Sequence, residues 1–233
     1  MLAAVERWLL PAACLLCDEP VSARENDALV CDLCRLRWRP IPHPVCERCG
    51  QPSFRGLECR LCGVWPSGLS RARSAVWLED SARDAVHQLK YQGWSRVAES
   101  MADAMRGLEP LTGQVCLVPV PLGAGRQRRR GYNQSERIAS ALQASTGLEL
   151  RTDLLLRVRE TQTQTALTPE SRHANVMGAF VAGAVSGLAL VLVDDVFTTG
   201  ATLAAAAAAL MESGANRVEA VTFARAVVDL DRG

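Results

Sequence analysis

The sequence predicts an α/β fold, a parallel sheet flanked by helices, which is preceded by a small zinc-ribbon domain. Residues 12–66 are rich in Pro, Arg and Cys and show little periodic hydrophobicity. From Arg73 onward, strand-like apolar runs alternate with helical patterns, which is typical of parallel strands joined by crossover helices. A chain of 233 residues has room for both parts, and we expect domains over 1–68 and 69–233.

Eight of the nine cysteines form four Cys-x-x-Cys pairs, and two such pairs complete a tetrahedral zinc site. Regular spacing and the α/β domain that follows favour zinc over disulfides, which are typical of small secreted domains. We expect neighbouring pairs to combine, although interleaved pairing is also compatible with the sequence. A closed Cys₄ site has no open position for substrate, so both zinc ions would be structural and stabilise a segment too short for its own core, by on the order of 10 kcal/mol per site. The predicted sites are Cys14, Cys17, Cys31 and Cys34, then Cys46, Cys49, Cys59 and Cys62.

The ninth cysteine, Cys116, precedes an apolar pair in a predicted strand, and we interpret it as a buried core thiol. The elements expected around it follow one another along the chain. Ser81 is the expected N-cap of the first helix, Gly93 and Gly147 follow helix ends, and Thr168 with Pro169 is typical of a helix start. The predicted strands are 74–78, 115–120, 154–158, 188–193 and 218–224, and the predicted helices are 81–92, 94–108 and 133–145, with an Ala-rich segment at 203–210.

An acid pair and a hydroxyl-rich turn follow the strand predicted at 188–193. Asp194 and Asp195 come where that strand is expected to end, at the sheet edge where α/β proteins usually bind ligands. Backbone N–H groups at a helix start favour a phosphate, while two carboxylates suit ribose hydroxyls or a Mg²⁺ ion on pyrophosphate. The competing interpretation is an ordinary strand-to-helix turn. We predict a ribose-phosphate site from the acid pair and the Thr-Gly turn, which is Thr198, Thr199, Gly200, Ala201 and Thr202.

A second candidate phosphate site is the Arg-rich segment after the strand at 115–120. Clustered arginines between a strand end and a helix start are typical of a phosphate or pyrophosphate site. The alternative is a solvated loop. The arginines in question are Arg126, Arg128, Arg129 and Arg130.

The acid pair with the Thr-Gly turn resembles the 5-phosphoribosyl-1-pyrophosphate (PRPP) motif of type I phosphoribosyltransferases. The resemblance implies that Asp194 and Asp195 hold the ribose hydroxyls, that the Thr-Gly turn holds the 5′-phosphate, and that the sheet is phosphoribosyltransferase-like. The stretch 160–171, with Arg157, Arg159 and Arg172 in or beside it, resembles the flexible loop that closes over PRPP in these enzymes, and its other interpretation is an exposed loop.

Over nearly its full length the chain resembles the ComF family of bacterial competence-type proteins. The motifs that carry this are the four cysteine pairs, Leu89-Lys90-Tyr91, Val118-Pro119-Val120-Pro121 and Arg130-Gly131-Tyr132-Asn133-Gln134. The resemblance implies PRPP binding and, in some members, the handling of single-stranded DNA during natural transformation.

We therefore expect a Mg²⁺-dependent phosphoribosyltransferase whose acceptor the sequence does not identify. The catalytic residues expected are Asp194, Asp195 and Arg172, and Arg126 and Arg130 are expected to bind PRPP with the Thr-Gly turn. The first alternative is a protein that binds single-stranded DNA or a DNA-uptake component. The second is a protein in which PRPP is a regulatory ligand and the zinc ribbon docks a partner.

A formal net charge of +1 gives no overall argument for nucleic acid. No stretch approaches the roughly 20 apolar residues of a membrane-spanning helix, so we expect a cytoplasmic protein. Residues 1–17 superficially resemble a signal peptide, but Glu6, Arg7 and Pro11 interrupt the apolar run. A short amphipathic helix that packs through Val5, Trp8 and Leu9 is the expected alternative.

Overall fold

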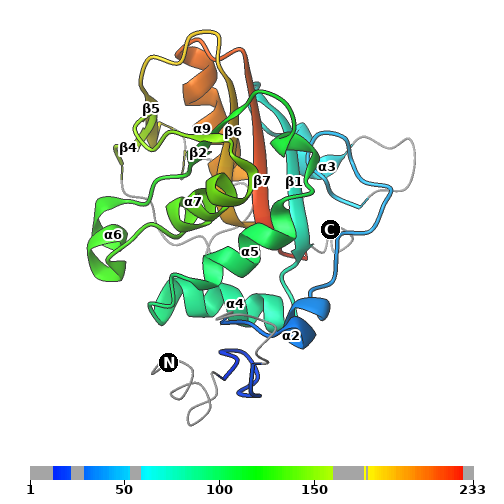
Figure 1. Ribbon diagram of the computed structural model, residues 1–233. Helices are drawn as coiled ribbons and strands as arrows, with labels where there is room; N and C mark the ends of the chain where they lie inside the picture. Colours follow the sequence, from blue (N-terminus) through cyan, green and yellow to red (C-terminus); the bar gives the residue numbers. More distant parts are fainter. Residues whose placement is uncertain (1–12, 22–28, 53–58, 160–175, 177, 228–233) are drawn as a thin grey trace.

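A five-stranded parallel sheet forms the centre of the molecule in the computed structural model (Figure 1), which describes residues 13–21, 29–52, 59–159, 176 and 178–227. Each pair of neighbouring strands in it is parallel, and β6, the strand of the acid pair, is central. The predicted parallel sheet is thus confirmed. In spatial order its strands are β1 (Leu69–Trp77), β7 (Arg217–Arg225), β6 (Ala189–Phe197), β2 (Cys116–Pro119) and β3 (Glu149–Leu150).

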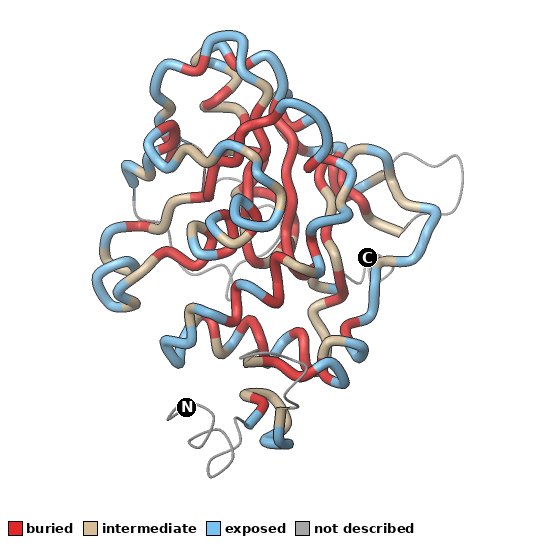
Figure 2. Tube along the Cα trace, in the orientation of Figure 1, coloured by how far each residue is buried: buried red, intermediate tan, exposed pale blue. Residues whose placement is uncertain are grey.

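Helices cover both faces of the sheet. Successive side chains of a strand point to opposite faces, so the apolar residues of each strand contribute to two cores. Val191 and Val193 of β6 join the core beneath α4 (Asp80–Tyr91), α5 (Val97–Met105) and α7 (Gln134–Thr146). Leu190 and Leu192 join the core on the other face, beneath α9 (Ala201–Glu212). The strands are accordingly buried along most of their length, while the outer sides of the helices are exposed (Figure 2). This three-layer arrangement confirms the expected fold class.

Two segments differ from the sequence-based expectation. The Arg-rich segment contains a helix, α6 (Ala124–Arg130), where we expected a loop. Arg is a good helix former, and Gly131 ends the helix in the left-handed conformation with φ 80°, so local preferences favour this seven-residue helix. The predicted strand at 154–158 is β4 (Leu155–Arg157), which pairs with β5 (Phe180–Ala182) in a separate antiparallel sheet.

Element boundaries were predicted less well than the elements themselves. The strand expected to end at residue 193 continues through the acid pair to Phe197, because Asp194 and Val196 still lie opposite β7 in the ladder. The predicted N-cap of α4 was wrong, since Glu79 holds that position and the Ser81 hydroxyl instead donates to the Cys34 carbonyl over 3.0 Å. Asn133 does cap α7, accepting a hydrogen bond from the Ser135 N–H over 3.1 Å.

Short helical turns complete the described part of the chain: α2 (Asp32–Leu36), α3 (Arg60–Gly63) and the 3₁₀ turn η2 (Glu109–Leu111). Among the described residues no helix is both long and apolar enough to cross a membrane. The expected N-terminal helix with Val5, Trp8 and Leu9, the helix start at Thr168 and Pro169, and the loop residue Arg172 lie outside the described residues.

Candidate functional site

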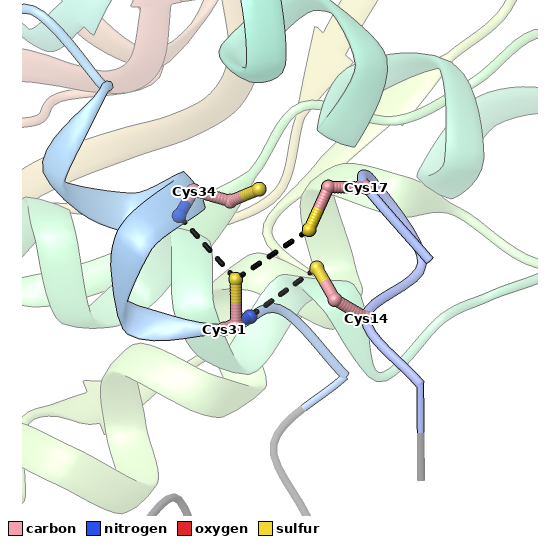
Figure 3. Close-up of side chains that lie close together, drawn as sticks. All are labelled: Cys14, Cys17, Cys31 and Cys34. Carbon is pink, nitrogen blue, oxygen red and sulfur yellow. Dashed lines mark hydrogen bonds between the residues drawn. The ribbon is translucent and has the colours of Figure 1, made fainter. Parts of the chain in front are cut away.

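The eight paired cysteines form two clusters, each made of neighbouring pairs along the chain. In each cluster the four sulfur atoms lie within 4.8 Å of one another. Figure 3 shows the four side chains of the first cluster. The Sγ–Sγ distances of 3.8 Å (Cys17–Cys31), 3.7 Å (Cys46–Cys62) and 3.5 Å (Cys49–Cys59) are close to the roughly 3.8 Å that a tetrahedral ion with about 2.3 Å zinc–sulfur bonds requires. The donor set therefore fits zinc, and sequential pairing is confirmed. The first Cys₄ cluster is Cys14, Cys17, Cys31 and Cys34, and the second is Cys46, Cys49, Cys59 and Cys62.

The two clusters belong to the cores of opposite faces of the sheet. Cys14, Cys31 and Cys34 are buried with the α4, α5 and α7 side chains, whereas Cys49 and Cys62 are buried with those of α9. Each cluster therefore replaces part of a hydrophobic core on its own face. Spacing along the sequence gave no indication of this separation.

The first Cys₄ cluster is stabilised by backbone donors and by α4. The N–H groups of Leu16 and Cys31 both donate to Cys14 Sγ over 3.4 Å, and such bonds favour the thiolate form that binds zinc (Figure 3 draws the second). Gln88 of α4 donates to the Leu15 carbonyl over 3.4 Å. By contrast, burial raises the pKa of the unpaired Cys116 to about 11, as expected for an inert core thiol.

The acid pair lies in the last part of β6, at the carboxyl edge of the sheet. Asp194 Oδ1 accepts hydrogen bonds from Ser135 Oγ over 2.7 Å and from the Asp195 N–H over 2.9 Å. Lys90 Nζ lies 2.9 Å from Asp195 Oδ2, an ion-pair distance although the angles are not those of a hydrogen bond. Burial, followed by the negative charge of Asp195, raises the pKa of Asp194 to about 6.

A cavity of about 290 Å³ opens beside the acid pair. It gathers two carboxylates and four cationic side chains from segments that lie far apart in the sequence. Hydroxyl groups of the Thr-Gly turn complete the wall. The lining residues are Lys90, Tyr91, Val120, Pro121, Leu122, Arg126, Arg130, Gln134, Ser135, Arg157, Asp194, Asp195, Val196, Thr198 and Thr202.

Six of the site residues expected from the sequence line this cavity: Asp194, Asp195, Thr198, Thr202, Arg126 and Arg130. The middle of the Thr-Gly turn lies behind the wall, because Thr199 is only 2% exposed and Ala201 faces a different cavity. Lys90, Gln134 and Ser135 were missed as site residues. Lys90 could have been found, since it is the only lysine of the chain and lies in one of the motifs quoted above.

The Thr-Gly turn begins α9, and Gly200 is its N-cap with a φ of 77°. Thr199 Oγ1 accepts a weak hydrogen bond of 3.4 Å from the Ala201 N–H. The first N–H groups of a helix have no partners within it, so the start of α9 presents donors and partial positive charge. This end of α9 can therefore bind an anion next to the acid pair.

The arginines of α6 divide into two groups. Arg126 and Arg130 are half-buried and line the cavity, and the Arg130 guanidinium lies 5.5 Å from the centre of the Tyr91 ring. Arg128 and Arg129 are exposed on the outer side of the helix. A single segment thus contributes cations both to the cavity and to the surface beside it.

Together these features define an α/β protein with two Cys₄ clusters and, at the carboxyl edge of its sheet, a cavity lined by acidic and basic side chains. Residues 5–63 match the family model of the double zinc ribbon domain. The chain is 32% identical to DNA utilization protein YhgH of Salmonella typhi, an alignment that covers 90% of this chain and 95% of that protein. It is 27% identical to competence protein ComFC of Bacillus subtilis, over 86% of this chain and 89% of that protein. The chain therefore belongs to the ComF family, which includes both relatives.

The similarity to a solved structure is weaker than the similarity to these relatives. A hypoxanthine phosphoribosyltransferase from Staphylococcus aureus superimposes with a TM-score of 0.32 and 14% identity, covering 64% of this chain and 70% of that one. At this TM-score the likeness adds nothing to what the sheet and its strand order show directly.

Proposed function

We propose that this protein binds PRPP at the carboxyl edge of its sheet and transfers the phosphoribosyl group to an acceptor. The observation that carries the proposal is the cavity that joins the acid pair, the Thr-Gly turn and two α6 arginines. Carboxylates complement ribose hydroxyls, whereas N–H groups and arginines complement the phosphates at the two ends of the same molecule. A ribose that carries two separate phosphate groups offers both kinds of group.

Each group has a distinct task in the proposed transfer. Asp194 and Asp195 accept hydrogen bonds from the ribose 2′- and 3′-hydroxyls, and the start of α9 binds the 5′-phosphate. Arg126 and Arg130 bind the pyrophosphate, whose bond to C1 breaks with the electron pair leaving on the pyrophosphate oxygen while the acceptor forms its bond to C1. Carboxylate oxygens are ligands that Mg²⁺ accepts, so the acid pair fits the Mg²⁺ ion that would neutralise the departing charge.

Calorimetric titration of Mg²⁺-PRPP into the zinc-loaded protein tests this proposal. The double variant Asp194→Asn/Asp195→Asn should lose binding, because the amides cannot offer the same acceptors or charge. Asp153→Asn is the matched control, since Asp153 is exposed and paired with Arg151 away from the cavity. Equal affinity of the double variant and the control would contradict the assignment. If only the control binds PRPP, release of pyrophosphate on addition of individual nucleobases would identify the acceptor.

A second candidate function is binding of single-stranded DNA. The relatives bear the names competence protein and DNA utilization protein, and the surface beside the cavity is suited to a single strand. Arg128 and Arg129 are exposed there, and the exposed ring of Tyr91, which lies against Arg130, offers stacking surface. The variant Arg128→Ala/Arg129→Ala should weaken retention on single-stranded DNA and flatten its salt dependence, while leaving PRPP affinity unchanged. Unchanged DNA retention would exclude this surface.

A further inference from the structure

The second Cys₄ cluster is connected to the Thr-Gly turn by a single residue, Trp65. The Trp65 backbone N–H donates to the carbonyl of the cluster residue Cys62 over 3.2 Å. At the other end of the same residue, the indole Nε1–H donates to the Thr199 carbonyl over 2.9 Å. Trp65 is only 5% exposed, so this contact between the cluster and the turn is shielded from water.

The indole ring also fixes the space around Gly200. A Cβ atom added at Gly200 would lie 2.2 Å from Trp65 Cζ2 and 2.9 Å from Phe197 Cζ, so only glycine fits. Arg48 in turn holds the Trp65 segment. Its Nη1 donates to the Cys62 carbonyl over 2.9 Å, and its guanidinium carbon lies 5.4 Å from the centre of the Trp65 ring. Because Arg48 lies between two cluster cysteines, the cluster determines where the indole lies.

A second connection reaches the residue that precedes the turn. Arg225 at the end of β7 is fully buried, and its guanidinium lies 3.9 Å from the centre of the Phe197 ring. The same guanidinium donates from Nη2 to the Cys49 carbonyl and from Nη1 to Gln51 Oε1, the latter over 3.2 Å. Phe197 and the Thr199–Gly200 peptide therefore both contact side chains that are bonded to the second Cys₄ cluster or to its neighbours.

We propose that the second Cys₄ cluster is a positioning device for phosphate binding, and that Trp65 and Arg225 transmit its position to the Thr-Gly turn. In a trans peptide the C=O and N–H point in opposite directions, so holding the Thr199 carbonyl at the indole aims the Gly200 N–H away from it. A turn fixed in this way binds its ligand without the cost of ordering a loop. The first Cys₄ cluster belongs to the core of the opposite face, so we expect no such role for it.

Linkage makes the coupling reciprocal, so a ligand that binds the turn should also raise the zinc affinity of the second cluster. This effect of the ligand depends on the phosphate site of the proposed function. The positioning itself does not, because the conformational freedom of the turn can be measured without any ligand.

Hydrogen exchange of the full-length, zinc-loaded protein tests the positioning. Trp65→Phe removes the indole donor and keeps most of the ring, so amides in a peptide spanning 197–203 should exchange roughly 5-fold faster, as expected for one lost hydrogen bond. Trp38→Phe is the matched control. Trp38 is equally buried, packs edge-on against Phe223 beside the first cluster, and its Nε1 has no hydrogen-bond partner in the described part of the chain. Equal exchange of the turn in the two variants would overturn the proposal.

A pair of ligand variants tests the role of each cluster. Cys59→Ser and Cys17→Ser each remove one half-buried thiolate, the former from the second cluster and the latter from the first. Only Cys59→Ser should accelerate exchange in the turn, and it should weaken Mg²⁺-PRPP binding by about 10-fold. An equal effect of both variants would mean that the two clusters only stabilise the fold, and it would contradict the proposal. If the wild-type protein does not bind PRPP, the proposed function fails while the exchange comparison still decides the positioning role.

Discussion

Gly200→Ala is the substitution that most directly tests the packing of the Thr-Gly turn. Gly200 has a φ of 77°, and an added Cβ would lie 2.2 Å from Trp65 Cζ2, 2.9 Å from Trp65 Cε2 and 2.9 Å from Phe197 Cζ. Trp65 and Phe197 are both buried, so neither ring can swing into solvent to make room. The turn or the indole must therefore move, and either movement disturbs the contact with the second Cys₄ cluster.

The expected cost has two parts that a control can separate. A side chain in the left-handed region costs about 1–2 kcal/mol, and overpacking a filled core costs a further 1–3 kcal/mol or so. Gly147→Ala incurs only the first part, because Gly147 has a φ of 74° and no atom lies within 4 Å of its added Cβ. The difference of about 1–3 kcal/mol corresponds to a melting temperature roughly 2–12 °C below that of the control.

Thermal melting of the zinc-loaded variants measures that difference, and calorimetric titration with Mg²⁺-PRPP measures its consequence for the site. Gly200→Ala should lose most of its PRPP affinity, whereas Gly147→Ala should keep it. In a Trp65→Ala background only the 2.9 Å contact with Phe197 remains, so the additional cost of Gly200→Ala should fall toward that of Gly147→Ala. Equal melting temperatures of the two glycine variants would refute the close contact between Gly200 and Trp65.

Four further predictions concern the metal and the acid pair. Metal analysis of protein purified without chelators should find two zinc ions per chain, and one ion or none would contradict the paired clusters. Because the pKa of Asp194 is raised to about 6, its ionisation opposes folding increasingly as pH rises from about 4 to about 6; Asp194→Asn should therefore raise the melting temperature more at pH 8 than at pH 5. Below pH 6, PRPP affinity should fall about 10-fold per pH unit through protonation of Asp194. The ligand's own titration adds to this fall, and the pH dependence of the residual binding of Asp194→Asn would measure that contribution. Ser135→Ala removes the 2.7 Å bond to Asp194 and should move the midpoint of that profile upward by up to about one pH unit, as followed by titration calorimetry across pH.

The elements of the fold could be predicted because each depends on local pattern. Alternation of apolar strands and helical segments identified the parallel sheet, and Asn133 with Gly147 marked the two ends of α7. We predicted the end of β6 too early, because acidic residues are uncommon within strands. Asp194 remains in the ladder, and its carboxylate accepts a hydrogen bond from Ser135 at the start of α7. A partner that lies 59 positions away along the chain leaves no local signal.

The same reasoning explains which site residues were missed. The Thr-Gly turn and the arginines of α6 could be identified because strand ends of a parallel sheet meet at one edge. Lys90 is different, since it lies near the end of a helix and reaches Asp195 only through the packing of α4 against the sheet.

An acid pair that is mostly buried needs compensation, and the compensation comes from tertiary contacts. Asp195, only 4% exposed, lies 2.9 Å from the ammonium of Lys90, while Asp194 accepts two hydrogen bonds and still has a raised pKa. Such unfavourable burial persists only where the surrounding structure holds it in place. In the positioning proposed above, the second Cys₄ cluster gives such support to the turn that follows the acid pair, through Trp65 and Arg225. If the support is required for ligand binding, the metal ribbon and the ligand site form one functional unit, and a domain boundary at residue 68 would separate parts that work together.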